Sequence, residues 1–141
     1  MKRMTTLPSA FFAFTMLSTV PLAAHHSSTY FAMDVDLVHE DVTVVEFEVE
    51  NPHGILIYSF VNEEGVEEIW DAELPSANFS RRGGIVPSLI SPGDTVTITG
   101  WPGLPGRTRE RIVRLSRVDL ADGSYATFTA ISASYVRAGE E

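Results

Sequence analysis

The fold of this chain is decided by an alternating stretch and the turn that follows it, VTVVEFEVENPHGILIYSFV, residues 42–61. Val45, Phe47 and Val49 alternate with glutamates, which predicts a strand with one buried face and one solvated face. The two valines before them have the opposite parity, so we expect a β-bulge near Val44. The sequence therefore predicts a sheet protein whose first strand is irregular.

A turn and a second strand complete this hairpin. Asn51-Pro52-His53-Gly54 has the composition of a turn, and the apolar residues 55–61 predict a central strand. The same signals predict four more strands and a short helix, capped by Ser76, that runs through Arg82 and stops at Gly83-Gly84. These strands are expected at residues 66–74, 95–101, 111–120 and 124–131.

The order of these elements predicts the fold class. Three strands, a short helix and then two or more strands is the order found in OB-type barrels. We therefore expect an all-β chain with one short helix, folded as a small OB-like barrel of five or six antiparallel strands. A β-sandwich with the same strand count is the alternative. In such a barrel, ligands meet strands two and three and the loops after strands one and four, here residues 51–54 and 102–106.

Length and composition limit the protein to one globular domain without thiol chemistry. The 141 residues fit a single domain, and the absence of cysteine excludes a disulfide scaffold, a thiolate metal site and a cysteine nucleophile. The formal charge of −9 argues against nucleic acid as a partner, because such affinity comes largely from Lys and Arg. The chain has no Gly-x-Ser-x-Gly elbow and no glycine-rich phosphate loop. We predict no catalytic residues and favour a protein that is not an enzyme.

The first 24 residues have the composition of a secretory signal peptide. Lys2 and Arg3 precede a short apolar run that ends in small residues at Ala23-Ala24. The run is shorter than the roughly 20 apolar residues of a spanning helix, and an uncleaved membrane anchor is the alternative. We expect cleavage after Ala24, which gives a periplasmic or secreted chain that does not associate with a membrane.

Cleavage changes the charge and defines the predicted parts of the chain. It removes two basic residues and no acidic one, which leaves 8 against 19 and a formal charge of −11. The predicted parts are a signal peptide at residues 1–24, an N-terminal arm at 25–41, one OB-like barrel domain at 42–137 and a frayed tail at 138–141.

Three histidines suggest a metal site. His25 and His26 begin the mature chain, and His53 lies in the turn after the first strand. Without thiolates, imidazole is the side chain here that suits copper, and a free α-amine at His25 would add a further nitrogen ligand. Glu73 or Asp34 would supply a carboxylate. We therefore predict a transition-metal site, most readily for copper, at His25, His26 and His53.

Each histidine also has a plainer interpretation. The pair His25-His26 could be a polar tail, His53 could be an exposed turn residue, and His39 is expected to lie on the surface. Cleavage after Ala23 would place His26 third, an arrangement that also suits Cu(II) or Ni(II) through amine, backbone and imidazole nitrogens.

Charged and aromatic residues further along the chain give weaker signals. Carboxylates within residues 67–73 are expected to form a solvated face. The arginines within residues 107–117 could pair with them or bind an anionic ligand. Trp70 could stack on a ligand, and core packing is the favoured role because its strand is predicted to be central.

Several motifs together resemble a family of exported bacterial proteins. They are His25-His26-Ser27 after the signal, Asn51-Pro52-His53, Trp70-x-x-Glu73, Arg81-Arg82-Gly83, Ser91-Pro92-Gly93-Asp94-x-Val96 and Asp122-Gly123. The family is a domain of unknown function, and the resemblance covers residues 25–123. It implies a small periplasmic β-rich domain without an established activity, and it adds Asn51 to the supporting candidates. The matching positions are His25, His26, Asn51, His53, Trp70, Glu73 and Arg82.

Two functions from different classes fit these observations. The first is an exported copper-binding protein that carries, sequesters or senses the metal. The second is a module that docks a peptide, glycan or envelope protein on strands two and three and on the loop of residues 102–106, without a metal. The expected partner is therefore a metal ion or an envelope ligand.

Overall fold

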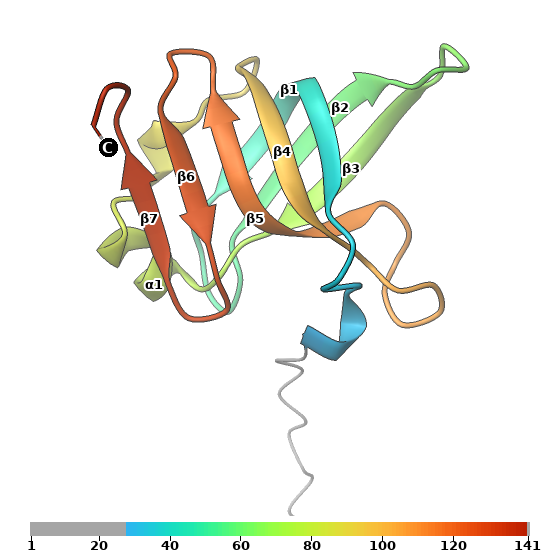
Figure 1. The fold of residues 1–141 in the computed structure, drawn as a ribbon, viewed down its shortest axis with the longest axis horizontal. Coiled ribbons are helices and arrows are strands. Elements are labelled where there is room, and N and C mark those ends of the chain that lie inside the picture. The colour runs from blue at the N-terminus through green and yellow to red at the C-terminus, as the bar shows by residue number, and fades with distance from the viewer. Residues whose placement is uncertain (1–27, 141) are drawn as a thin grey trace, which may run out of the picture.

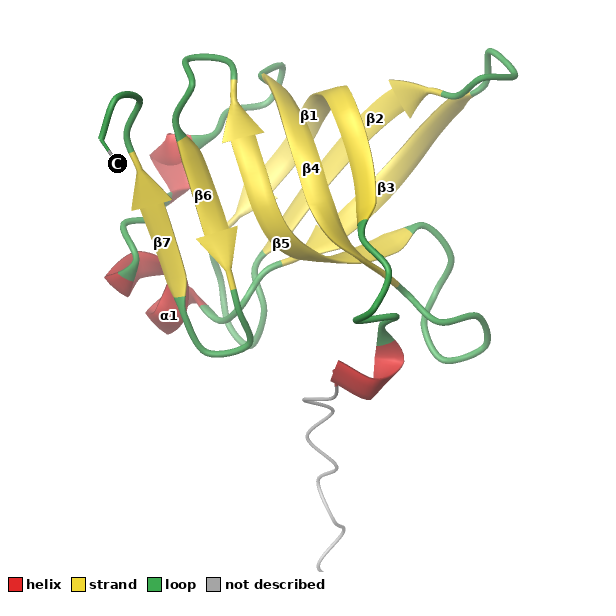
Figure 2. Cartoon of the chain, viewed as in Figure 1, coloured by secondary structure: helices red, strands yellow, loops and turns green. Residues whose placement is uncertain are grey.

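The computed structural model describes residues 28–140 of the chain, which form one closed sheet with short helical segments (Figures 1 and 2). Within this range, no helix is long and apolar enough to cross a membrane. The elements in chain order are η1 (Ser28–Tyr30), β1 (Leu37–Glu48), β2 (Ile55–Val61), β3 (Glu67–Glu73), α1 (Ala77–Arg82), η2 (Pro87–Leu89), β4 (Thr95–Pro102), β5 (Ile112–Leu120), β6 (Tyr125–Phe128) and β7 (Ala133–Val136).

Five strands close into a barrel in the order β1-β2-β3-β5-β4, with β4 returning to β1. The neighbours are antiparallel except for β3 and β5, which pair in parallel where Asp71 lies opposite Ile112. Beyond this pairing β5 stays paired with β4 on one edge, while residues 117–119 of its other edge pair with β6, which in turn pairs with β7. The predicted OB-like barrel with one short helix is confirmed, with a parallel closing pair and two extra strands.

Strand β1 is long because two register shifts let it change partners. Its first half pairs with β4 and its second half with β2. The shift just after Val44 confirms the predicted bulge. A second shift lies between His39 and Val42, where Asp41 has a φ of 51°. This second bulge interrupts the alternation of buried and exposed residues. The sequence pattern therefore misses the first part of β1, which begins at Leu37.

Helix α1 packs against β7, the last strand of the sheet. Helix α1 ends at Arg82 with Gly83 as its C-cap, as predicted, whereas Ser76 makes no side-chain capping hydrogen bond. The carbonyl of Gly83 accepts a hydrogen bond of 2.8 Å from the Tyr135 amide of β7. A Cβ atom at Gly83 would lie 2.0 Å from the carbonyl oxygen of Ala133. A glycine is therefore required where the helix end meets β7, a strand that the sequence pattern did not predict.

Candidate functional site

His53 lies where the β1–β2 loop meets the end of β3. Gly54 holds the loop in place, since its amide donates to the carbonyl of Pro75 at 3.3 Å and its carbonyl accepts from Leu74 at 2.9 Å. As a result, Nδ1 of His53 lies 3.7 Å from Oε1 of Glu73, and each side chain is 28% exposed. The structure thus brings together two of the predicted site residues, with each side chain partly exposed and Nδ1 of His53 itself buried.

The N-terminal arm passes the same end of the barrel. Phe31 is buried and forms a β-bridge with Gly103, and the carbonyl of Tyr30 accepts a hydrogen bond of 2.8 Å from Leu104. Tyr30 and Phe31 also line a cavity of about 430 Å³ together with Glu73. The described part of the arm therefore begins close to the carboxylate of Glu73.

The other predicted metal residues lie elsewhere or outside the described range. His25 and His26 precede residue 28. Asp34 lies in an exposed turn of the arm, and Asn51 is exposed at the start of the β1–β2 loop. Within the part of the chain that the structure describes, no group of three histidine or acidic side chains is arranged to hold a metal ion. The predicted three-histidine set has two members outside that part.

A second cluster surrounds His39, and the prediction of a surface position for this residue was wrong. The bulge at Asp41 changes the parity of β1, so His39 faces the same side as the buried valines that follow. Nδ1 of His39 is hydrogen-bonded to the Tyr58 hydroxyl at 2.9 Å. The centroid of its ring lies 4.4 Å from that of Phe60 and 4.9 Å from that of Trp70. His39 is therefore a half-buried member of an aromatic cluster.

Burial sets the protonation of the His39–Tyr58 pair. It lowers the pKa of His39, an effect that the charge of Glu68 opposes in part. Burial also raises the pKa of Tyr58 far above its usual range, and the charge of Asp71 adds to this. The pair is thus a neutral imidazole and a neutral phenol at pH 7.

Glu68 is held beside this pair by two donors. Its Oε2 accepts a hydrogen bond of 2.7 Å from the Trp70 indole, and its Oε1 accepts one of 2.9 Å from the Asn62 side chain. These hydrogen bonds, the one from Trp70 first, lower the pKa of Glu68. Nε of Arg111 lies 3.8 Å from Oε2. Glu68 is therefore a fixed and ionised carboxylate at the edge of the aromatic cluster.

Trp70 is half-buried at the edge of the core and also borders the β4–β5 loop. It lines a cavity of about 280 Å³ together with residues 102–103 and 105–106 of that loop. Arg109 links the loop to β3 through an ion pair of 2.5 Å with Asp71. The pairing of arginines in residues 107–117 with carboxylates of β3 is confirmed by this contact and by Arg111 beside Glu68.

The architecture places this chain among small OB-like β-barrel domains, here with a histidine–carboxylate pair at one end. The chain belongs to a family of unknown function (DUF6152), whose match covers residues 14–111. No curated protein and no solved structure matches the chain. The matched range contains the seven matching positions named from the sequence but not the Asp122-Gly123 motif. One of the seven, Arg82, is exposed at the end of α1 with its guanidinium 5.9 Å from the centroid of the Phe79 ring.

Proposed function

We propose that this protein is exported to the periplasm and binds a transition-metal ion there, copper most readily, through His25, His26 and His53. One observation carries the proposal. Tyr30 and Phe31 of the arm border the same cavity as Glu73, whose carboxylate lies 3.7 Å from Nδ1 of His53. The N-terminal arm and the turn histidine therefore approach the same end of the barrel.

The length of chain between the histidines and the docked arm fits this arrangement. His26 and His25 precede Ser28 by two and three residues. Since a residue spans at most about 3.3–3.6 Å, their reach from Ser28 is about 7–10 Å. The proposed site therefore needs no more than this reach to bring both imidazoles to the end of the barrel at which the arm is bound.

The donor set favours copper. Imidazole nitrogens, a free α-amine and a carboxylate form a mixed nitrogen and oxygen set, and Cu(II) binds such sets more tightly than the other divalent first-row ions. An oxidising compartment supports this oxidation state. Cleavage after Ala23 instead of Ala24 would make His26 the third residue. Copper would remain the favoured ion, with backbone nitrogens among its ligands beside the amine and the imidazole. Carriage, sequestration or sensing of the ion are the roles that fit.

The test uses the full chain expressed with its own N-terminus and recovered from the periplasm. Mass spectrometry identifies the cleavage site, and Cu(II) titration is followed by ligand-field absorption and electron paramagnetic resonance. We expect one copper per chain, and His53→Ala is expected to weaken binding by at least about tenfold. His39→Gln is the matched control, because His39 lies in the other cluster. Micromolar or weaker binding that does not change in His53→Ala would contradict the proposal.

A second candidate is a metal-independent module for a peptide, a glycan or an envelope protein. The observation in its favour is the cavity between Trp70 and the β4–β5 loop, because an indole beside a loop suits the stacking of a flat ligand face. Capture of a partner from envelope extract, repeated with a chelator and with Trp70→Leu, separates the two functions. Capture that persists with the chelator and is lost in Trp70→Leu would favour this module.

A further inference from the structure

The inward face of β2 and β3 continues past the core into an open mouth of the barrel. Phe60 and Glu68 are register partners, one inward position beyond the pair Tyr58 and Trp70. The β2–β3 hairpin extends away from the barrel at this point (Figure 1). Phe60 and Glu68 therefore remain partly exposed, although they lie on the face that is buried further along the strands.

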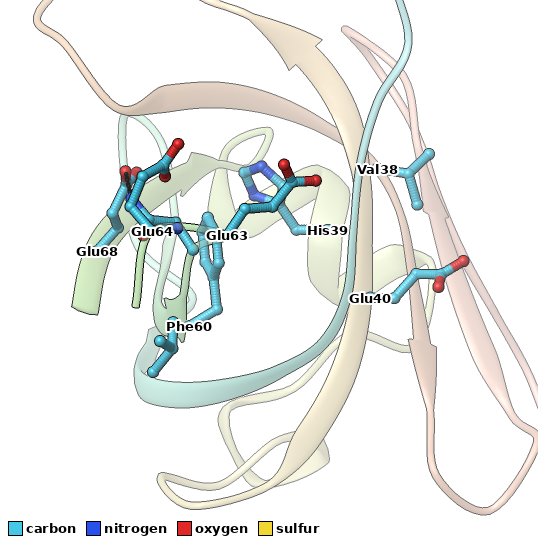
Figure 3. Close-up of a pocket in the computed structure, with 9 residues that line it drawn as sticks. Val38, His39, Glu40, Phe60, Glu63, Glu64 and Glu68 are labelled. Atoms are coloured by element: carbon cyan, nitrogen blue, oxygen red, sulfur yellow. Dashed lines mark hydrogen bonds between the residues drawn. The ribbon is translucent and has the colours of Figure 1, made fainter. Parts of the chain in front are cut away.

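A cavity of about 460 Å³ lies at this mouth, between the start of β1 and the β2–β3 hairpin. Figure 3 shows His39 and Glu68 directed to one side of β1, and Val38 and Glu40 to the other. Four of its 9 lining residues are glutamates, and none is Lys or Arg. The only imidazole in the lining is that of His39, which is neutral at pH 7 because burial lowers its pKa. Although Glu40 is directed away, the other three glutamates, Glu63, Glu64 and Glu68, give the cavity a net negative charge.

One of these carboxylates is held rigidly by the hairpin. Asn62 donates to Oε1 of Glu68, and its own Oδ1 accepts hydrogen bonds from the amides of Glu64 and Val66 at 3.1 and 2.9 Å. Each oxygen of Glu68 has one hydrogen-bond donor, from Asn62 or Trp70, so lone pairs remain for a further donor. Arg111 approaches Glu68 from outside the cavity lining. Glu68 is therefore oriented before any ligand binds.

Apolar surface adjoins these carboxylates. The Phe60 ring packs on the His39 imidazole with 4.4 Å between centroids. Val61, which is 67% exposed, also contributes to the lining. Aromatic and aliphatic surface next to a carboxylate suits an alkyl chain that ends in a positive charge, since the ring face attracts cations and the methyl groups cover the chain.

We propose that this cavity binds an organic cation, namely a primary ammonium or guanidinium group on an alkyl chain, with Glu68 as its anchor and Phe60 as its wall. Glu63 and Glu64 add long-range attraction from the hairpin. The charge of the lining disfavours anions, and an apolar wall suits an alkyl chain better than a strongly hydrated metal ion. The site is separate from the histidine–carboxylate pair at His53 and does not depend on the proposed metal.

The test measures the affinity of the full chain, recovered from the periplasm, for two amine probes by calorimetry in the presence of a chelator. The probes are 1,5-diaminopentane and an acetylated tetralysine peptide, and 1,5-pentanediol is the neutral analogue. The stronger of the two amines identifies a free amine or a peptide side chain as the source of the cation. We expect amine binding that weakens as salt is added, and no binding of the diol.

Variants locate the site. Glu68→Gln is expected to weaken amine binding by at least about tenfold. The double variant Glu63→Gln/Glu64→Gln changes exposed residues only and is expected to weaken it by about three- to tenfold, so the test does not rest on the folding of Glu68→Gln alone. Glu67→Gln removes the same charge from the neighbouring residue outside the cavity and is the matched control. Equal losses in Glu67→Gln and Glu68→Gln, or equal affinity for amine and diol, would overturn the proposal. His53→Ala should leave amine affinity unchanged.

Discussion

His39 Nδ1 and the Tyr58 hydroxyl are joined by a hydrogen bond of 2.9 Å at the boundary between the barrel core and the cavity at its mouth. Tyr58 is fully buried, whereas His39 is half-buried. A buried hydroxyl needs a partner, and here the partner is an imidazole that is itself kept neutral by burial. This hydrogen bond connects the stability of the core to the shape of the cavity.

Removal of the Tyr58 hydroxyl is expected to destabilise the barrel. In Tyr58→Phe the free energy of unfolding should fall by about 1–2 kcal/mol, because Nδ1 of His39 loses its hydrogen-bond partner while the ring packing remains. Urea unfolding measures the change. Tyr135→Phe, a half-buried tyrosine of β7, is the matched control and should change the free energy by at most about 0.5 kcal/mol. Equal losses in the two variants would show that the hydrogen bond contributes no stability.

Stability is expected to depend on the protonation of His39. Burial lowers its pKa in the folded state below the unfolded value of 6.5, so the unfolded chain binds the proton more tightly. The contribution of neutral His39 to the free energy of unfolding is therefore complete above pH 6.5. It is lost as the pH falls from 6.5 towards the lower pKa of His39 in the folded state. Glu68 and Tyr58 face the imidazole, and neither titrates in this range, because the pKa of Glu68 is lowered and that of Tyr58 is raised.

The measurement is urea unfolding of the wild-type chain and of His39→Gln between about pH 7.5 and about pH 5.5. The wild-type chain should lose more free energy of unfolding across this interval than His39→Gln does. Gln keeps a polar group that can pair with the Tyr58 hydroxyl and does not titrate. Parallel pH profiles for the two chains would rule out His39 as the source of the loss.

The aromatic cluster also shows where sequence reasoning stops. Alternation in residues 45–49 and the turn signals predicted most strands and the helix, because these are local patterns. The bulge at Asp41 has no comparable local signal, and it determines which side of β1 His39 occupies. Strand alternation alone places Tyr58 and Phe60 on one face of β2, and Glu68 and Trp70 on one face of β3. The shared face within each strand was therefore predictable from the sequence. Their convergence with His39 depends on the register between distant strands.

The His53–Glu73 pair was more accessible to sequence reasoning. His53 lies in a turn that is recognisable from Asn51 and Pro52, and Glu73 belongs to the Trp70-x-x-Glu73 motif of the same family resemblance. The parallel closure of β3 on β5 was not predictable from local patterns, because it joins strands about forty residues apart. That closure also draws the β4–β5 loop towards the end of β3, where the arm is bound.

A side chain at Gly83 is expected to detach β7 from the helix. Gly83→Ala places a Cβ atom 2.0 Å from the Ala133 carbonyl, so the backbone must separate, at a cost of about 1–3 kcal/mol. Hydrogen exchange should show reduced protection of the Tyr135 amide, which donates to Gly83. Gly123→Ala tests a glycine with positive φ whose added Cβ would meet no atom closer than Cβ of Ala138 at 3.7 Å, and it should cost about 1 kcal/mol without a change at Tyr135. Unchanged protection of Tyr135 in Gly83→Ala would contradict the contact.

The docked arm is expected to support copper binding through Phe31. This side chain is 7% exposed and secures the arm at Gly103, so Phe31→Ala should lower the free energy of unfolding by about 2–4 kcal/mol. It should also weaken Cu(II) binding by at least about tenfold, because a detached arm must lose more conformational freedom to bring His25 and His26 to His53. Calorimetric titration is done at a temperature at which circular dichroism shows both chains folded. Met33→Ala removes an exposed side chain of the same arm and should leave the affinity within about twofold. If Phe31→Ala and Met33→Ala bound copper equally well, the metal ligands would not depend on the docked arm, and the three-histidine site would have to be abandoned.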